Sequence, residues 1–136
     1  MKPHRARILA MQAIFQTEIH QRDIEEISSF DWIDYEVPED EKKFSLEIIK
    51  GVMENLESID KIIIEYSKNW DFKRISMVSK AILRISLYQL MKMKNEISHK
   101  IIIDEAIKIA KEYAEEDSTR FINGILDTYY KDTQKI

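Results

Sequence analysis

The chain has 136 residues, with no cysteine, two glycines, two prolines and a formal net charge of −4. The absence of cysteine excludes disulfide scaffolds, thiolate metal sites and cysteine catalysis, and it fits a reducing cytoplasm. Gly51 and Gly124 lie too far apart to form a glycine-rich phosphate loop, which excludes nucleotide sites of that kind. The scarcity of turn-forming residues favours one all-helical domain.

The charges are distributed unevenly along the chain. Residues 23–60 carry thirteen acidic and three basic side chains, whereas residues 61–136 carry fourteen basic and eleven acidic ones. A basic surface can therefore exist on a protein whose net charge is negative. The longest isoleucine runs have three residues, which predicts no membrane span, and no signal peptide is expected at the basic N-terminus. We expect a cytoplasmic protein.

Apolar residues recur at helical spacing along most of the chain. This spacing predicts helices over residues 5–20, 23–30, 39–66, 77–93, 100–115 and from 118 onward, with loops at 31–37 and 94–99 and a connector at 69–76. Asp23 and Glu26 have the spacing of a capping box, and Pro38 suits the first turn of a helix. The last helix is expected to be capped by Asp117 or Ser118.

Two of these helices have distinctive patterns. The stripe from Phe44 to Tyr66 is unbroken and predicts one rod of roughly 28 residues and about 40 Å. Residues 77–93 are apolar on most sides, which is typical of a buried central helix. Gly124 interrupts the last helix at a cost of about 1 kcal/mol, and close approach of another backbone or a ligand would explain it. The result is an all-α fold of six or seven helices, in two sub-bundles of about residues 1–68 and 69–136.

Catalysis is not predicted. His4, His20 and His99 all fall at predicted helix ends and have no partner at ligand spacing, so no metal site is expected. Asp104 and Glu105 are adjacent on a helix and point about 100° apart, which is typical of a solvated surface. The sequence therefore predicts neither an enzyme nor a bound cofactor.

Basic and aromatic residues together indicate single-stranded RNA as one candidate ligand. Phe15, Tyr113 and Phe121 are candidate stacking platforms near basic side chains. These basic residues include a flexible N-terminal arm and Lys73, Arg74, Lys80, Arg84, Lys108, Lys111 and Arg120. Aromatic residues at helical spacing more often belong to a core, so composition alone favours a protein–protein adaptor over an RNA-binding protein.

Four blocks of sequence, in order and at matching spacing, resemble the NusB family of bacterial transcription antitermination factors. They are RARxxAxQAxF at residues 5–15, Trp70-x-x-x-Arg74 followed by AILRISLYQL at 81–90, IDEAIKIAKEY at 103–113 and DSTRFINGILD at 117–127. The resemblance covers residues 3–130. It implies seven helices in two sub-bundles and binding of single-stranded boxA RNA together with NusE, a ribosomal protein. It also implies assembly with other Nus factors on RNA polymerase, notably at ribosomal RNA operons.

The resemblance also implies an RNA surface where the N-terminal arm lies close to the start of the last helix. Its candidate residues are Lys2, His4, Arg5, Arg7, Gln12, Phe15, Gln16, Lys111, Ser118, Arg120, Phe121 and Asn123. The basic side chains and the helix N-terminus would hold phosphates. Phe15 and Phe121 would stack on bases, and the amide side chains would bind base edges. Tight packing of the last helix would then explain Gly124.

By the same resemblance, the protein partner docks around the connector and the start of the following helix. The implied interface is an apolar strip flanked by charges, consisting of Lys73, Ile75, Met77, Val78, Ser79 and Ile82. Lys73 and Ser79 depart from the acidic residues that many members of the family have there. The charge pattern of this interface is therefore expected to differ.

Two alternatives stay open at this point. One is a relative of the NusB-like domain that is fused to ribosomal RNA methyltransferases, although the chain stops at Ile136 without a catalytic domain, which favours a stand-alone factor. The other is a helical adaptor that binds only protein and has no affinity for RNA. A homodimer is also plausible, since an unoccupied partner surface can self-associate.

Overall fold

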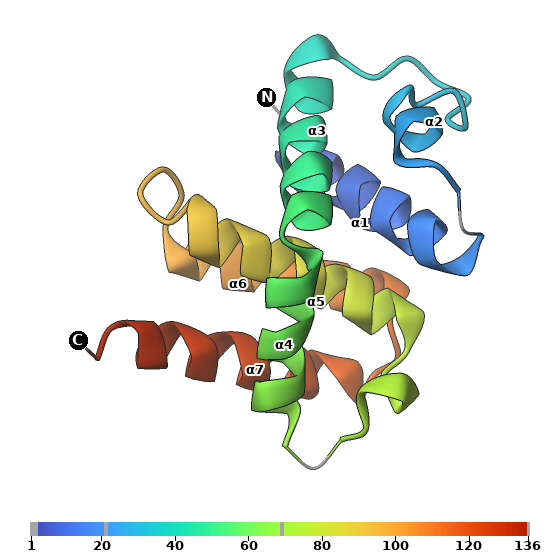
Figure 1. Ribbon diagram of the computed structural model, residues 1–136. Coiled ribbons are helices and arrows are strands. Elements are labelled where there is room, and N and C mark those ends of the chain that lie inside the picture. The colour runs from blue at the N-terminus through green and yellow to red at the C-terminus, as the bar shows by residue number, and fades with distance from the viewer. Residues whose placement is uncertain (1–2, 21, 69, 136) are drawn as a thin grey trace.

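The computed structural model describes residues 3–20, 22–68 and 70–135, which form seven α-helices and one short 3₁₀-helix joined by loops. The helices are α1 (Pro3–Ile19), α2 (Ile24–Ser28), α3 (Glu39–Glu54), α4 (Leu56–Ser67), η1 (Phe72–Arg74), α5 (Met77–Lys92), α6 (His99–Tyr113) and α7 (Ser118–Thr133). Figure 1 shows their arrangement. The predicted all-α class is confirmed. Within the described ranges, no helix combines the length and apolarity needed to cross a lipid bilayer.

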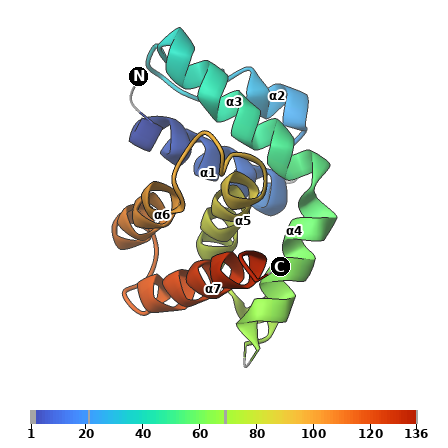
Figure 2. The ribbon, with the colours of Figure 1, turned by 90° about the vertical axis from the view of Figure 1, so that its left-hand side faces the viewer.

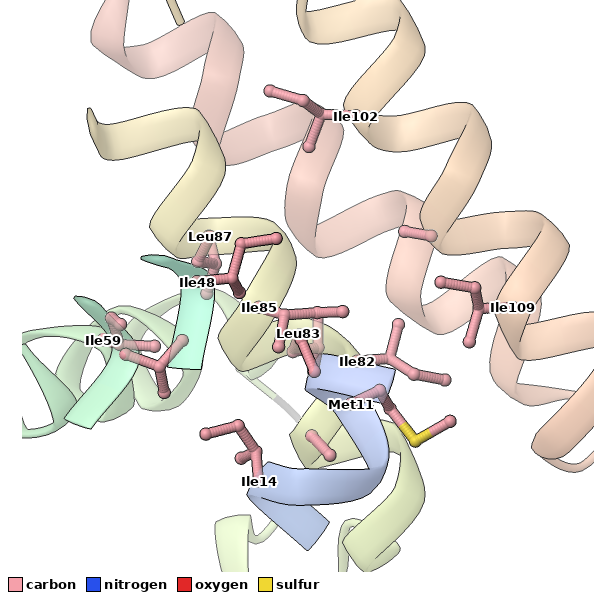
Figure 3. Packing of buried hydrophobic residues seen from close by; sticks show 14 of the residues in the cluster. Met11, Ile14, Ile48, Ile59, Ile82, Leu83, Ile85, Leu87, Ile102 and Ile109 are labelled. Atoms are coloured by element: carbon pink, nitrogen blue, oxygen red, sulfur yellow. The ribbon is translucent and has the colours of Figure 1, made fainter. Parts of the chain in front are cut away.

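Helix α5 is the centre of the molecule. It contacts α1, α3, α4, α6 and α7, and Figure 2 shows it between them. Every residue from Ser79 to Leu87 is buried, as the apolar pattern predicted. Figure 3 shows Ile82, Leu83 and Ile85 of α5 among side chains from neighbouring helices. Each fully buried side chain of this size contributes about 1.5–3 kcal/mol to folding, so α5 anchors the core.

Side-chain caps explain where several helices begin. Asp23 caps α2 by accepting a hydrogen bond from the backbone of Glu25, and Ser76 and Ser98 cap α5 and α6 in the same way. The capping box predicted at Asp23 is only half formed, because the carboxylate of Glu26 binds Arg22 instead. Asp117 occupies the cap position of α7 without a side-chain hydrogen bond. Pro38 precedes α3 rather than lying in its first turn.

The single rod predicted between residues 39 and 66 is wrong, because the helix breaks at Asn55. This residue leaves helical geometry, with φ of −116° and ψ of 17°. Its side-chain nitrogen donates a 2.7 Å hydrogen bond to the carbonyl of Gly51, and its backbone N–H donates to the carbonyls of Gly51 and Val52. An asparagine side chain can compete in this way with the regular helical ladder. The break turns α4 toward α5 and α7, which it contacts (Figure 1).

The two glycines differ in how closely other residues approach them. At Gly51 an added Cβ would overlap the ring of Tyr88, so this glycine permits the close packing of α3 on α5. At Gly124 an added Cβ would meet no atom of the described residues within 4 Å. The expectation that tight packing of the last helix explains Gly124 is therefore wrong. Helical continuity through Gly124 is confirmed, since it lies inside α7.

A buried cluster of ions joins three helices. Arg84 of α5 forms a two-point ion pair with Asp60 of α4, both hydrogen bonds being 2.9 Å, and it also binds Glu18 of α1. Lys80 lies 4.0 Å from Glu18, and its ammonium group lies over the ring of Phe72. Lys80 and Arg84 are therefore structural, and their inclusion among the basic residues of an RNA surface is wrong. The division into two sub-bundles near residue 68 stays a prediction.

Candidate nucleic-acid interface

The basic N-terminal segment is a helix rather than a flexible arm, since α1 begins at Pro3. Lys2 lies outside the described residues. Arg5 is 42% exposed and donates three hydrogen bonds of 2.9–3.2 Å to the carboxylate of Glu41 in the first turn of α3. Glu41 is only 1% exposed, so its charge depends on Arg5 for compensation. Arg5 is therefore already paired with Glu41 in the absence of RNA.

Arg7 is buried, at 2% exposure, so it cannot contact RNA phosphates in this conformation. The expectation that it neutralises them is wrong for this structure. Its Nε donates a 2.7 Å hydrogen bond to Gln89, and its guanidinium lies over the ring of Phe44. Burial lowers the pKa of Arg7, and the carboxylate of Glu105, 3.6 Å away, partly opposes that shift. Among the residues that the structure describes, its Nη1 finds no hydrogen-bond partner. Arg7 therefore joins α1 to α5 and α6.

His4 also lies against α6. Its Nδ1 binds the carboxylate of Glu105, and its Nε2 lies 3.5 Å from the carboxylate of Glu112. The described side-chain contacts of His4, Arg5 and Arg7 thus lead to α3, α5 and α6. The N-terminal segment was expected to lie close to the start of α7, but these contacts include no residue of α7.

The middle of α1 presents a second group of predicted residues. Gln12 and Phe15 are half-buried and line a small hollow of about 160 Å³ together with Met11, Val78 and Tyr113. Gln16 accepts a 2.8 Å hydrogen bond from Arg22. Phe15 was predicted to bind RNA and Val78 to bind the protein partner, so the structure brings these two predicted surfaces together.

The start of α7 carries the most accessible of the predicted RNA residues. Arg120 and Asn123 are exposed, Ser118 and Phe121 are half-buried, and Lys111 is exposed near the end of α6. The backbone N–H of Ser118 already donates to the carbonyl of Glu115, so it is not available to a phosphate. The ring of Phe121 packs against Trp70, with 5.2 Å between the ring centroids.

The predicted partner strip is only partly at the surface. Lys73 and Met77 are exposed and Val78 is half-buried. Ile75, Ser79 and Ile82 are buried, at 6%, 2% and 0% exposure, and therefore cannot contact a partner without rearrangement. The connector residue Ile75 packs inward, and α5 is buried from Ser79 onward because other helices surround it. The assignment of these three residues to an exposed interface is wrong.

Trp70 is an accessible aromatic residue of the connector, and it is not among the residues predicted to bind RNA or the protein partner. Lys68, which ends α4 with a φ of 38°, turns the chain, and the N–H of Trp70 donates to the carbonyl of Ser67. The indole remains 59% exposed. Lys68, Arg74 and Arg120 lie with it along two adjacent hollows. A tryptophan in a short connector rich in basic residues was the available signal.

The described residues thus define an all-helical protein that exposes aromatic and basic side chains around the start of α7. Metal-binding clusters of histidine, aspartate or glutamate are not found among the described residues. Aromatic and basic side chains together are typical of surfaces that bind single-stranded nucleic acid or a protein partner.

Comparison with known proteins agrees with this class. The model of the NusB family matches residues 4–131. The transcription antitermination protein NusB of Leptospira biflexa is 39% identical over 128 residues, covering 94% of this chain and 91% of that protein. NusB of T. maritima has 36% identity and a TM-score of 0.88, over 97% of this chain and 92% of that structure. This chain belongs to the NusB family.

A further solved structure shows antitermination factors NusB and NusE in complex with dsRNA. The chain compared there has 21% identity and a TM-score of 0.78, covering 97% of this chain and 99% of that chain. This similarity is one of fold.

Proposed function

We propose that this protein is a bacterial transcription antitermination factor that binds single-stranded boxA RNA together with NusE. It then assembles with other Nus factors on RNA polymerase in the cytoplasm, notably at ribosomal RNA operons. It acts by binding and carries out no catalysis. The observation that carries this proposal is membership of the NusB family along residues 4–131, nearly the whole chain. The names of the relatives, and the NusB–NusE complex with RNA, support it.

The proposed RNA surface is narrower than the sequence predicted. Its accessible part consists of Lys111, Ser118, Arg120, Phe121 and Asn123, and the proposal also keeps the half-buried Gln12, Phe15 and Gln16 of α1. His4 and Arg5 join it only when RNA phosphates compete with Glu105 and Glu41 for them. The proposed partner surface is centred on Lys73, Met77 and Val78, next to Phe15.

A protein-only adaptor is the second candidate, because Arg5 and Arg7 are already occupied by partners within the fold. Fluorescence anisotropy with a labelled boxA RNA and a scrambled RNA of equal length, with and without NusE and across a salt series, separates the two. The proposal expects tighter binding to boxA than to the scrambled RNA, strengthened by NusE. Equal affinity for both RNAs with NusE bound would overturn the proposed specificity, and NusE binding without RNA affinity would establish the adaptor.

A further inference from the structure

A hollow of about 300 Å³ beside Trp70, here called the Trp70 hollow, separates the end of α4 from α7. Its lining includes Lys68, Trp70, Arg120, Phe121, Gly124 and Thr128. Trp70 is held by its ring contact with Phe121, at an interplanar angle of 59°, and still exposes 59% of its surface. An indole that is braced on one side and open on the other is suited to stacking a flat ligand.

The charges around the Trp70 hollow have one sign. Lys68 and Arg120 contribute cations, and none of the described residues that line it carries a carboxylate. A second hollow, which Trp70 and Phe121 also line, differs because Glu115 and Asp117 lie there with Arg74. In a chain of net charge −4, a hollow with aromatic rings, cations and no acidic side chain favours an anionic aromatic ligand.

Gly124 supplies an independent argument. Glycine within a helix is unfavourable relative to alanine, yet here the backbone needs no positive φ, and within the described part of the chain a Cβ would meet no atom within 4 Å. Neither conformation nor internal packing therefore explains this glycine. Since Gly124 lines the Trp70 hollow, its missing side chain leaves room for a group from outside the chain.

We propose that the Trp70 hollow binds one nucleotide of single-stranded RNA, with its base stacked on Trp70 above Gly124 and its phosphates at Arg120 and Lys68. This inference rests on the proposed function and extends it by one nucleotide beyond the RNA surface at the start of α7. Continuity supports RNA over a protein segment, because Arg120 and Phe121 belong both to that surface and to the hollow. A stacked base needs no sequence-specific contact, so the site tolerates several bases.

The test uses the full chain with NusE and two RNAs, a boxA RNA and the same RNA with additional unpaired nucleotides at each end. Replacing Trp32 with phenylalanine leaves Trp70 as the sole tryptophan, so its emission and its quenching by acrylamide report the hollow directly. Gly124→Leu fills the hollow from an open helix face, and its thermal unfolding shows that it is folded. Ser58→Leu, at an exposed position of α4, is the matched control.

The longer RNA should quench Trp70 emission and protect it from acrylamide. Gly124→Leu should bind the longer RNA about tenfold more weakly than the wild type. Gly124→Leu and the control Ser58→Leu should both bind the shorter RNA like the wild type. Trp70→Ala should lose at least about fivefold on the longer RNA, and Trp70→Phe less.

Three outcomes would overturn the inference. If the wild type binds boxA RNA specifically but Trp70 stays accessible and Gly124→Leu binds the longer RNA normally, the hollow holds no nucleotide and the proposed function stands. If NusE alone protects Trp70, and Gly124→Leu weakens NusE binding, the hollow is a protein site. If the wild type shows no preference for boxA, the proposed function and this inference fail together.

Discussion

Arg5 on α1 donates three hydrogen bonds to Glu41 on α3, and the two ends of this ion pair have very different environments. The guanidinium is 42% exposed, whereas the carboxylate is 1% exposed. Breaking a pair of this kind penalises chiefly the buried partner, which is left charged without compensation. The contact therefore stabilises the packing of α1 on α3, in addition to any role that Arg5 has toward RNA.

Replacement of Arg5 by alanine should destabilise the fold more than replacement of Glu41 by glutamine. Arg5→Ala leaves a buried carboxylate unpaired and is expected to lower the free energy of unfolding by about 1–2 kcal/mol, the exposure of Arg5 limiting the loss. Glu41→Gln removes the buried charge and keeps an acceptor. Urea unfolding of the wild type, Arg5→Ala and Glu41→Gln measures the difference in the free energy of unfolding. An equal loss of stability in both variants would contradict this account of the ion pair.

Arg7 and Arg120 should behave oppositely in RNA binding. Arg7 is buried against Gln89 and Phe44, so Arg7→Met should lower stability and leave the salt dependence of RNA binding unchanged. Arg120 is exposed, so Arg120→Ala should leave stability unchanged and flatten the slope of log K against log salt by about 0.7, the value for one phosphate of a single strand. Anisotropy titrations over a salt series test both variants, at a temperature where Arg7→Met is folded. A flatter slope for Arg7→Met would show that Arg7 leaves its buried position to bind RNA.

Alanine at the two glycines should change stability in opposite directions. Gly51→Ala must displace the ring of Tyr88 and is expected to lower the free energy of unfolding by about 1–3 kcal/mol. Gly124→Ala meets open space within a helix and is expected to raise it by about 1 kcal/mol. Thermal unfolding of both variants and the wild type, monitored by circular dichroism at 222 nm, measures these changes in stability. Destabilisation by Gly124→Ala would show that an internal constraint on this residue exists after all.

The partner surface can be tested with one exposed and one buried residue of α5. Met77→Asp places a charge on the proposed interface and should weaken NusE binding while the fold stays intact, because Met77 is 36% exposed. Ile82→Ala should lower the free energy of unfolding by about 2–5 kcal/mol through a core cavity, and the fraction that remains folded should bind NusE normally. Calorimetric titration with NusE, corrected for the folded fraction, separates the two effects. Normal NusE binding by Met77→Asp would remove this residue from the interface.

The helices could be predicted from the sequence because each carries an apolar face at helical spacing, and the buried pattern of residues 77–93 marked α5 as central. The break at Asn55 could not, because the apolar stripe continues across this residue, and its departure from helical geometry leaves no periodic signal in the sequence. A basic residue gives no sign in sequence of whether it faces solvent. Arg7, Lys80 and Arg84 were predicted for RNA because their partners Gln89, Glu18 and Asp60 are distant in the chain.

For the candidate site, the structure can be compared with the sequence only in the exposure of each predicted residue, and its role in binding stays a prediction. Arg120, Asn123 and Lys111 lie on the surface as expected, but exposure alone does not establish binding. Ile75, Ser79 and Ile82 were misplaced because an apolar strip looks alike in sequence whether a partner or another helix covers it. Trp70 was overlooked because the connector has no periodic pattern from which its exposure could be inferred.

The position of α5 has a consequence for how the molecule opens. Since α5 packs against α1, α3 and α4 as well as α6 and α7, both halves of the chain contribute to the core around α5. Amide protons in the middle of α5 should therefore exchange with deuterium only when the whole chain unfolds, whereas those of the short α2 should exchange through local opening. A proteolytic nick between α4 and α5 would not release two folded fragments but two chains that require each other to stay folded.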